Sequence, residues 1–266
     1  MKNNRHKTQK TERLGSINKN TFGTEMKIIE YYGAYNIIIE FQDEYKYKTK
    51  ATYQQFINGE VFNPYDKRVF NIGYLGDGKY ESCLNGIKNK IYKCWNHIFE
   101  RCYNPYILNK QPTYIDCYID EEWHCFQNFA KWCEENYYEC NGEVMQLDKD
   151  ILIKGNKIYS PETCIFVPER INKLFTKRQN HRGNYPIGVK EHGGRLEVYC
   201  NIFKDGKYKQ KYLASFPLDK PFQAFTCYKQ FKENYIKQVA DEYYSKGLIP
   251  KKLYDAMYKY EVEIND

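Results

Sequence analysis

Two short apolar runs and an alternating stretch characterise the N-terminal part of the chain. The runs cover residues 26–31 and 36–41 and are separated by Gly33, and residues 45–52 alternate between apolar and polar side chains. A period of two places alternate side chains on opposite faces of a β-strand. The pattern therefore predicts a small β-rich module within residues 1–80.

Glycine and proline mark the end of this module. Residues 53–56 are expected to form a short turn or the end of a helix, and Asn63-Pro64 then interrupts the pattern. Residues 1–12 are polar and basic and are expected to form a disordered tail. A glycine-rich linker is predicted from Gly73, Gly76 and Gly78.

Apolar residues in the middle of the chain recur at helical spacing. The first set is Ile87, Ile91, Trp95, Ile98 and Cys102, and the second is Trp123, Phe126, Phe129, Ala130 and Cys133. We expect two helices whose aromatic side chains lie in a core rather than on a base-stacking surface. Extended stretches are expected at 114–118 and 164–167, and Pro168 is well placed to start a short helix over 169–175.

The C-terminal part combines both periods. Strands are predicted at 187–191, 196–203 and 211–216, with turns at Gly193-Gly194 and at Asp205-Gly206. One long amphipathic helix is predicted from Phe222, Phe225, Tyr228, Phe231, Tyr235, Val239 and Tyr243. The predicted fold class is α+β: the N-terminal β module, a central ββα-containing module over 81–179, and a three-stranded antiparallel sheet packed on one helix over 180–266.

Alternation along the strand at 196–203 assigns its side chains to two faces. The residues expected to point inward onto the helix are Leu196, Val198, Cys200 and Ile202. The residues expected to face outward are Arg195, Glu197, Tyr199, Asn201 and Phe203.

Charge is unevenly distributed along a chain whose net charge is +7. Residues 170–220 contain twelve Lys and Arg against four Asp and Glu, whereas residues 120–170 contain five against eleven. A basic face beside an acidic pocket suits a protein that holds phosphate with one part and a divalent cation with another. Two solvated loops of opposite sign are an equal alternative.

Bulk properties narrow the class of protein. The mean hydropathy is −0.82, no apolar run approaches the roughly 18 residues of a membrane span, and the polar start lacks the apolar part of a secretory signal. We therefore expect a cytoplasmic protein with no membrane partner. The ten cysteines include no Cys-x-x-Cys pair, so we expect buried thiols rather than disulfides or zinc ligands, with Cys94 and His97 as the best remaining ligand pair.

A motif in the central module carries most of the functional information. It consists of residues 147–150, residues 155–164 and Asn172, which read Leu-Asp-Lys-Asp, then Gly-Asn-Lys-Ile-Tyr-Ser-Pro-Glu-Thr-Cys, then a later Asn. Together with upstream aromatic residues, it resembles the HNH endonuclease-like proteins of phages over roughly residues 90–176.

The resemblance implies a divalent-metal site, with Mg²⁺ or Mn²⁺ held by Asp148 and by Asn172 as second ligand or its orienting group. It further implies that Asn156 and Tyr159 hold the connecting loop in shape and that Glu162 is a candidate to assist catalysis. The family's general-base histidine is replaced by Lys149, a poor base near neutral pH, and Thr163 stands where Asn is usual. His124 and His97 are alternative candidates for the base, and catalytic and degenerate versions of the site both stay open.

The C-terminal unit resembles the Apetala-type (ethylene-response-factor-like) DNA-binding domain that phage HNH homing endonucleases often carry. The similarity lies in residues 185–189, 196–203, 213–216 and 224–225, although the family's usual tryptophan and many arginines are missing. It implies that the sheet lies in the major groove of double-stranded DNA, with Tyr199 and Asn201 near base edges. The expected phosphate contacts are Lys190, Arg195, Lys204, Lys207, Lys209 and Lys211, joined by Arg178 and Arg182 of the preceding segment.

These features predict a phage or prophage DNA-binding protein that nicks or cleaves DNA with a divalent metal, a hydrolase of the homing-endonuclease type. The alternative is a catalytically degenerate DNA-binding regulator or host-interaction protein. A protein-interaction module that binds no nucleic acid is a third candidate. Homodimer formation, the target sequence and the role of the N-terminal module are left open.

Overall fold

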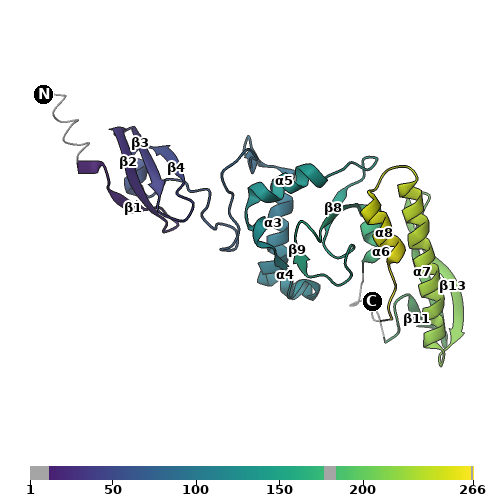
Figure 1. Ribbon diagram of the computed structural model, residues 1–266. Helices are drawn as coiled ribbons and strands as arrows, with labels where there is room; N and C mark the ends of the chain where they lie inside the picture. The colour runs from purple at the N-terminus through teal and green to yellow at the C-terminus, as the bar shows by residue number, and fades with distance from the viewer. Residues whose placement is uncertain (1–11, 177–183, 265) are drawn as a thin grey trace. The chain divides into compact units, whose positions relative to one another are not determined.

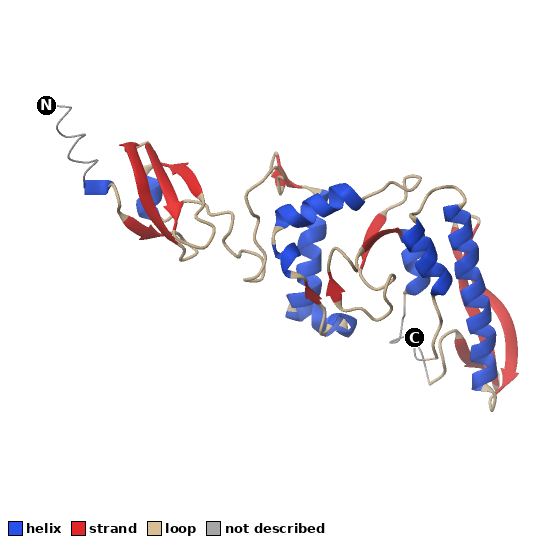
Figure 2. Cartoon of the chain, viewed as in Figure 1, coloured by secondary structure: helices blue, strands red, loops and turns tan. Residues whose placement is uncertain are grey.

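The computed structural model describes residues 12–176, 184–264 and 266. The chain divides into two compact units of mixed α and β structure: one runs to Gln111 and includes Glu121–Lys131, and the other combines Pro112–Asp120 with Trp132–Asp266 (Figure 1). Both units contain helices and strands, as the colouring in Figure 2 shows. The predicted disordered tail at 1–12 falls, except for Glu12, outside the described residues.

A four-stranded antiparallel sheet forms the N-terminal module, with its strands side by side in chain order. Alternate residues of its strands, together with Phe56, form a closed apolar core, so the prediction of a small β module is confirmed. The four strands and the short helix that follows them are β1 (Ile17–Lys19), β2 (Glu25–Gly33), β3 (Asn36–Phe41), β4 (Lys48–Ala51) and α2 (Tyr53–Asn58).

The predicted glycine-rich linker is instead packed structure. Gly73 forms a β-bridge with Val69, and a Cβ added to Gly73 would come within 2.8 Å of the Phe99 ring. Gly76 and Gly78 lie equally close to other side chains. Glycine is needed here because the backbone approaches a core closely, not because the segment is loose.

Helix α3 (Lys90–Tyr103) carries the aromatic core of the first unit, together with the start of α5 (Phe126–Asn136). Trp95 is fully buried and donates a hydrogen bond of 2.8 Å from Nε1 to the Trp123 carbonyl, so the prediction of core tryptophans is confirmed. Ile87 was assigned to the helix wrongly. It lies in a short exposed hairpin of β5 (Cys83–Leu84) and β6 (Ile87–Lys88), because Asn89 caps the helix after it.

The second unit begins with short elements, including the 3-10 helix η1 (Pro112–Tyr114). This helix overlaps the start of the extended stretch that was predicted at 114–118. Strand β7 (Tyr118–Ile119) pairs with β9 (Ile158–Tyr159) in parallel. Strand β8 (Met145–Asp148) pairs antiparallel with β10 (Ile165–Pro168), and α6 (Glu169–Phe175) follows at once from Pro168. The predicted ββα arrangement and its short helix are thus confirmed. Helix α4 (Pro105–Lys110) and η2 (Glu121–His124) belong to the first unit.

The C-terminal sheet contains the predicted three antiparallel strands. They are β11 (Val189–His192), β12 (Arg195–Lys204) and β13 (Lys207–Pro217). Asp205 and Gly206 both have positive φ, as a two-residue hairpin turn requires. Helix α7 (Pro221–Tyr244) packs on the sheet as predicted, and α8 (Lys251–Lys259), a further C-terminal helix that was expected without bounds, packs on α7 (Figure 1).

Helix α7 contributes to two apolar cores. Its first half packs on the inward residues of the sheet, including Leu196 and Val198. Its second half packs with residues of β10, α6 and α8, including Ile171 and Leu253. Because one continuous helix belongs to both cores, α6 and the C-terminal sheet are held in one compact unit.

Candidate nucleic-acid interface

The register of the β12–β13 hairpin places its lysines on one side. Lys211 lies opposite Cys200, Lys209 opposite Ile202, and Lys207 opposite Lys204. Directly opposed residues of an antiparallel pair point to the same face. All four lysines therefore share the face that carries the buried Cys200, although they extend beyond the core and are exposed.

The segment that carries these lysines contains little negative charge. Asp205 is the single acidic residue of the segment 202–211, and it pairs with Lys209 at 2.9 Å. Lys211 packs over Phe231 of α7, with Nζ 4.7 Å from the ring centroid. This contact fixes the stem of the side chain while its ammonium group stays accessible.

The opposite face of the hairpin carries amides between aromatic rings. Asn201 pairs across the strands with Gln210. One neighbouring pair is Tyr199 with Tyr212, with ring centroids 5.5 Å apart, and the other is Phe203 with Tyr208, at 5.0 Å. The predicted outward orientation of Tyr199, Asn201 and Phe203 agrees with this register.

Two of the predicted phosphate contacts lie on this second face. Lys190 sits over the Tyr199 ring, with Nζ 4.1 Å from its centroid, and Arg195 donates from Nε to the Ser215 hydroxyl at 2.8 Å. The six predicted lysine and arginine contacts of the sheet therefore do not form one rim, because strand alternation divides them. Arg178 and Arg182 lie outside the described residues.

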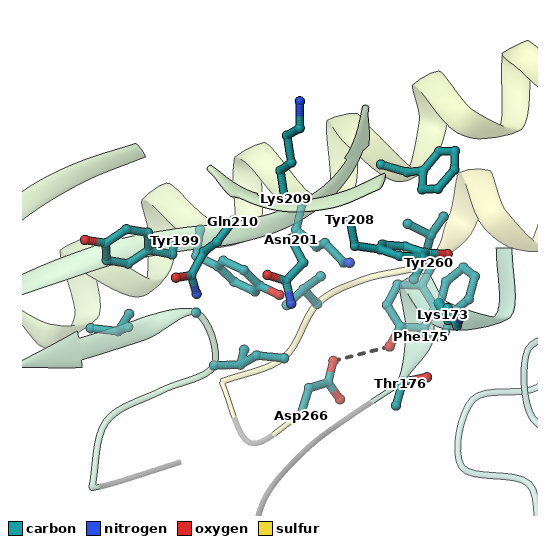
Figure 3. A pocket seen from close by; sticks show the side chains of 18 of the residues that line it. Lys173, Phe175, Thr176, Tyr199, Asn201, Tyr208, Lys209, Gln210, Tyr260 and Asp266 are labelled. Carbon is teal, nitrogen blue, oxygen red and sulfur yellow. Dashed lines mark hydrogen bonds between the residues drawn. The ribbon is translucent and has the colours of Figure 1, made fainter. Parts of the chain in front are cut away.

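A pocket of about 590 Å³ opens beside β12. It is lined by Tyr199, Asn201 and Gln210 of the sheet, and Figure 3 shows these side chains on one side of the strands while Lys209 points to the other. Further walls come from α6, including Lys173, and from the C-terminal segment, including Tyr260. The sheet face that was expected to lie against DNA thus also forms one wall of this pocket, with Asn201 and Gln210 exposed.

Lys232 of α7 lines the same pocket and is only 9% exposed. Its ammonium group has no hydrogen-bond or ion-pair partner among the residues that the structure describes. Burial lowers the pKa of this amine from its ordinary value. A buried ammonium group without a partner is stabilised when an anion binds beside it.

The HNH-like loop is held by its own polar side chains. Lys149 is 7% exposed and donates from Nζ to the Asn156 carbonyl at 2.7 Å and to Asp150 at 3.3 Å. The Asn156 amide donates in return to the carbonyls of Lys149 and Ile158, at 2.6 and 2.7 Å. The prediction that Asn156 shapes this loop is confirmed. Lys149, in the usual histidine position, stabilises the loop from inside through its hydrogen bonds.

Asp148 ends β8, where one carboxylate oxygen accepts the backbone N–H groups of Asp150 and Ile151, at 2.9 and 2.8 Å. Burial, followed by the charge of Asp150, raises the pKa of Asp148 to about 6. The Asn172 amide donates to the Gln146 side chain. Gln146 and Asp148 are two residues apart on one strand, so Asn172 lies over the face to which Asp148 points.

No cluster of three or more His, Cys, Asp or Glu ligands occurs in residues 12–176, 184–264 and 266. The Lys149 ammonium, bonded to Asp150, adds positive charge where a cation would need negative charge. Metal binding by Asp148 and Asn172 stays a prediction.

The other catalytic candidates belong to other elements than this loop. His124 belongs to the first unit, where its ring lies 6.4 Å from that of Phe99, while Asp148 belongs to the second. Glu162 is exposed in a turn. Thr163, in place of the family's usual Asn, donates from its hydroxyl to the Ile158 carbonyl at 2.8 Å and so stabilises that turn.

Seven of the ten cysteines are buried, as expected of apolar thiols, and none of the ten forms a disulfide in the described part of the chain. Burial raises the pKa of Cys94 to about 11, which disfavours the thiolate form that binds metals.

Sequence reasoning missed Lys232 and the Gln210–Tyr208 side of the hairpin, whereas Lys173 belongs to the basic segment that was expected to follow the DNA backbone. A signal existed for Lys232, because it interrupts the apolar stripe of the predicted helix between Tyr228 and Ile236. Counting outward from the turn at Asp205-Gly206 would have assigned Gln210 to the face of Asn201.

No helix of the described residues has the length and apolar character that a membrane crossing requires. Comparison of the chain with family models, with curated proteins and with solved structures gives no match.

Proposed function

We propose that this protein binds DNA and that the β12–β13 hairpin holds the phosphate backbone. The observation that carries the proposal is the collection of Lys204, Lys207, Lys209 and Lys211 on one exposed side, with Asp205 as the single acidic residue of the segment. Phosphate contacts by lysine release counterions from DNA and supply most of the affinity for an unselected sequence. The resemblance to an Apetala-type DNA-binding domain supports the same assignment.

We further propose that binding, rather than cleavage, is the function of the HNH-like module. Its Lys149 is buried in the loop and donates to the Asn156 carbonyl, so it is not free to take a proton from water. Asp148 uses one carboxylate oxygen to cap two backbone N–H groups. Both observations favour the catalytically degenerate alternative.

Fluorescence anisotropy of a labelled DNA duplex, titrated with the full chain over a series of salt concentrations, tests the binding. We expect affinity at low ionic strength and a linear loss of log affinity with log salt. Absence of binding at low salt would rule out the proposed function.

A plasmid-nicking assay tests the second part. The wild-type chain and Asp148→Ala are incubated with supercoiled DNA and Mg²⁺ or Mn²⁺, separately. We expect no metal-dependent nicking by either protein. Nicking by the wild type that Asp148→Ala abolishes would instead establish the endonuclease.

A further inference from the structure

The pocket beside β12 has walls on more than one side, although Asn201 and Gln210 are themselves exposed. A sheet reads the major groove by protruding into it. Here Tyr199, Asn201 and Gln210 line a pocket whose other walls are the end of α6 and the C-terminal segment (Figure 3). A stacked base pair cannot leave its neighbours to enter between these walls, whereas an unpaired base can.

The chemistry of the wall suits a nucleobase. Asn201 and Gln210 each offer an amide donor and an acceptor, the pair of functions that base edges present. They lie between the Tyr199–Tyr212 pair and the Phe203–Tyr208 pair, and aromatic rings stack on any base. The volume of about 590 Å³ falls within the usual range of small-ligand sites.

The open edge of β12 adds a backbone donor. The Tyr199 N–H bonds to the Gly188 carbonyl at 2.8 Å, and the Phe203 N–H bonds to the Tyr235 hydroxyl at 2.8 Å. The N–H of Asn201, midway between them, points to the same edge because strand amides alternate in direction. Strand β11 pairs with β12 only as far as Val198. After that residue, the same edge of β12 faces the pocket instead of another strand.

Lysines line the same space, together with Asp266, which is paired with Lys154 at 3.0 Å. Lys190 lies over Tyr199, and Lys173 lies over Tyr208 with Nζ 4.9 Å from the ring centroid. Lys232 supplies a nearly buried ammonium group with no partner among the described residues, and the pocket is the space that it borders. Amides between aromatic rings, in a pocket that Lys232 also lines, fit an anion attached to a base.

We infer that this pocket receives one unpaired nucleotide of a DNA strand, with its base between the aromatic pairs of β12–β13 and its phosphate near Lys232. The inference rests on the proposed DNA-binding function and names the form of DNA that the site recognises. The lysine side of the hairpin binds backbone without distinguishing strands, and the pocket adds the preference for an unpaired base.

Anisotropy with a labelled single-stranded oligonucleotide and with the matching duplex tests the inference. The variants are Lys232→Met, which keeps an unbranched apolar stem in the buried position, and the double variant Asn201→Ala, Gln210→Ala at exposed positions. Lys252→Met is the control, because Lys252 is an exposed lysine of α8 outside the pocket. Circular dichroism of each variant checks folding.

We expect the wild type to prefer the single strand and each pocket variant to lose about tenfold in single-strand affinity, the size of one base-stacking or charged contact. Duplex affinity should not change in these variants, nor either affinity in the control. Duplex binding without a single-strand preference, unaffected by the variants, overturns the inference and leaves the proposed function intact. Failure to bind either form overturns both.

Discussion

Lys211 lies directly opposite Cys200 across β12 and β13, so a charged side chain shares a face with a buried thiol. This pairing shows how the hairpin separates its chemistry. The part of this face nearest α7 packs on that helix. Farther along the hairpin the same face carries lysines, whose stems lie near apolar groups and whose ammonium groups reach solvent. The other face is left for amides and aromatic rings.

The separation predicts the salt dependence of DNA binding. The double variant Lys209→Ala, Lys211→Ala should bind duplex more weakly, and the slope of log affinity against log salt should decrease by about 2, since each lost phosphate contact removes about 0.9. Anisotropy titrations at several salt concentrations measure the slope. Lys252→Ala with Lys259→Ala removes the same charge from α8 and should leave the slope unchanged. An equal decrease in both double variants would show that net charge alone is responsible.

Gly188 is required by the packing of the sheet on α7. Its φ is +77°, and a Cβ at this position would overlap the ring of Tyr228. Gly188→Ala should lower the free energy of unfolding by about 3 kcal/mol or more, from backbone strain and overpacking together. Gly206→Ala is the matched control, because Gly206 has a φ of +72° but open space around it, so it should cost only about 1 kcal/mol. Urea unfolding measures both, and equal losses would contradict the packing argument.

Restoring the family's histidine should not create a nuclease. In Lys149→His the shorter imidazole loses the 2.7 Å bond to the Asn156 carbonyl, and we expect a loss of about 1–3 kcal/mol in unfolding free energy. The plasmid-nicking assay with Mg²⁺ should stay negative, because the Asp148 oxygen remains engaged with the loop backbone. Metal-dependent nicking by this variant would show that only the base is missing from a working site.

The bidentate bond between Arg170 and Glu242 predicts a pH dependence of stability. Arg170 donates to the two Glu242 oxygens at 3.0 and 2.8 Å, which lowers the pKa of that carboxyl below its ordinary value. A carboxyl with a lowered folded-state pKa stabilises the protein above the ordinary glutamate pKa, and this contribution is lost as the pH falls through the lower value. The wild type should therefore be more stable than Glu242→Gln at neutral pH, with the difference vanishing in acid. The urea midpoints of unfolding of both proteins, measured across the acid range, test this. A stability difference that stays constant with pH would contradict it.

Much of the fold followed from local patterns in the sequence. Alternation and a two-residue turn were sufficient for the C-terminal strands, and apolar spacing was sufficient for the long helix. Gly73 was misassigned because a glycine needed for close packing looks like a glycine in a linker. Helix α8 could not be given bounds because its two buried residues, Leu253 and Met257, make only one helical repeat.

The candidate site was less predictable. The two faces of the hairpin follow from the register that the turn at Asp205-Gly206 sets, so the sequence contained that information. The pocket did not follow, because it needs α6, the edge of β12 and the C-terminal segment around Tyr260 to come together. No local pattern specifies contacts between segments so far apart in the chain.

Photochemical cross-linking tests most directly where the DNA lies. A single-stranded oligonucleotide containing 5-bromouracil is irradiated with the full chain, and the cross-linked residues are identified by mass spectrometry. We predict cross-links at Tyr199 and Tyr208, which Lys232→Met reduces. Cross-links confined to the N-terminal sheet, or to the loop around Asp148, would contradict the assignment of the C-terminal hairpin as the DNA-binding element.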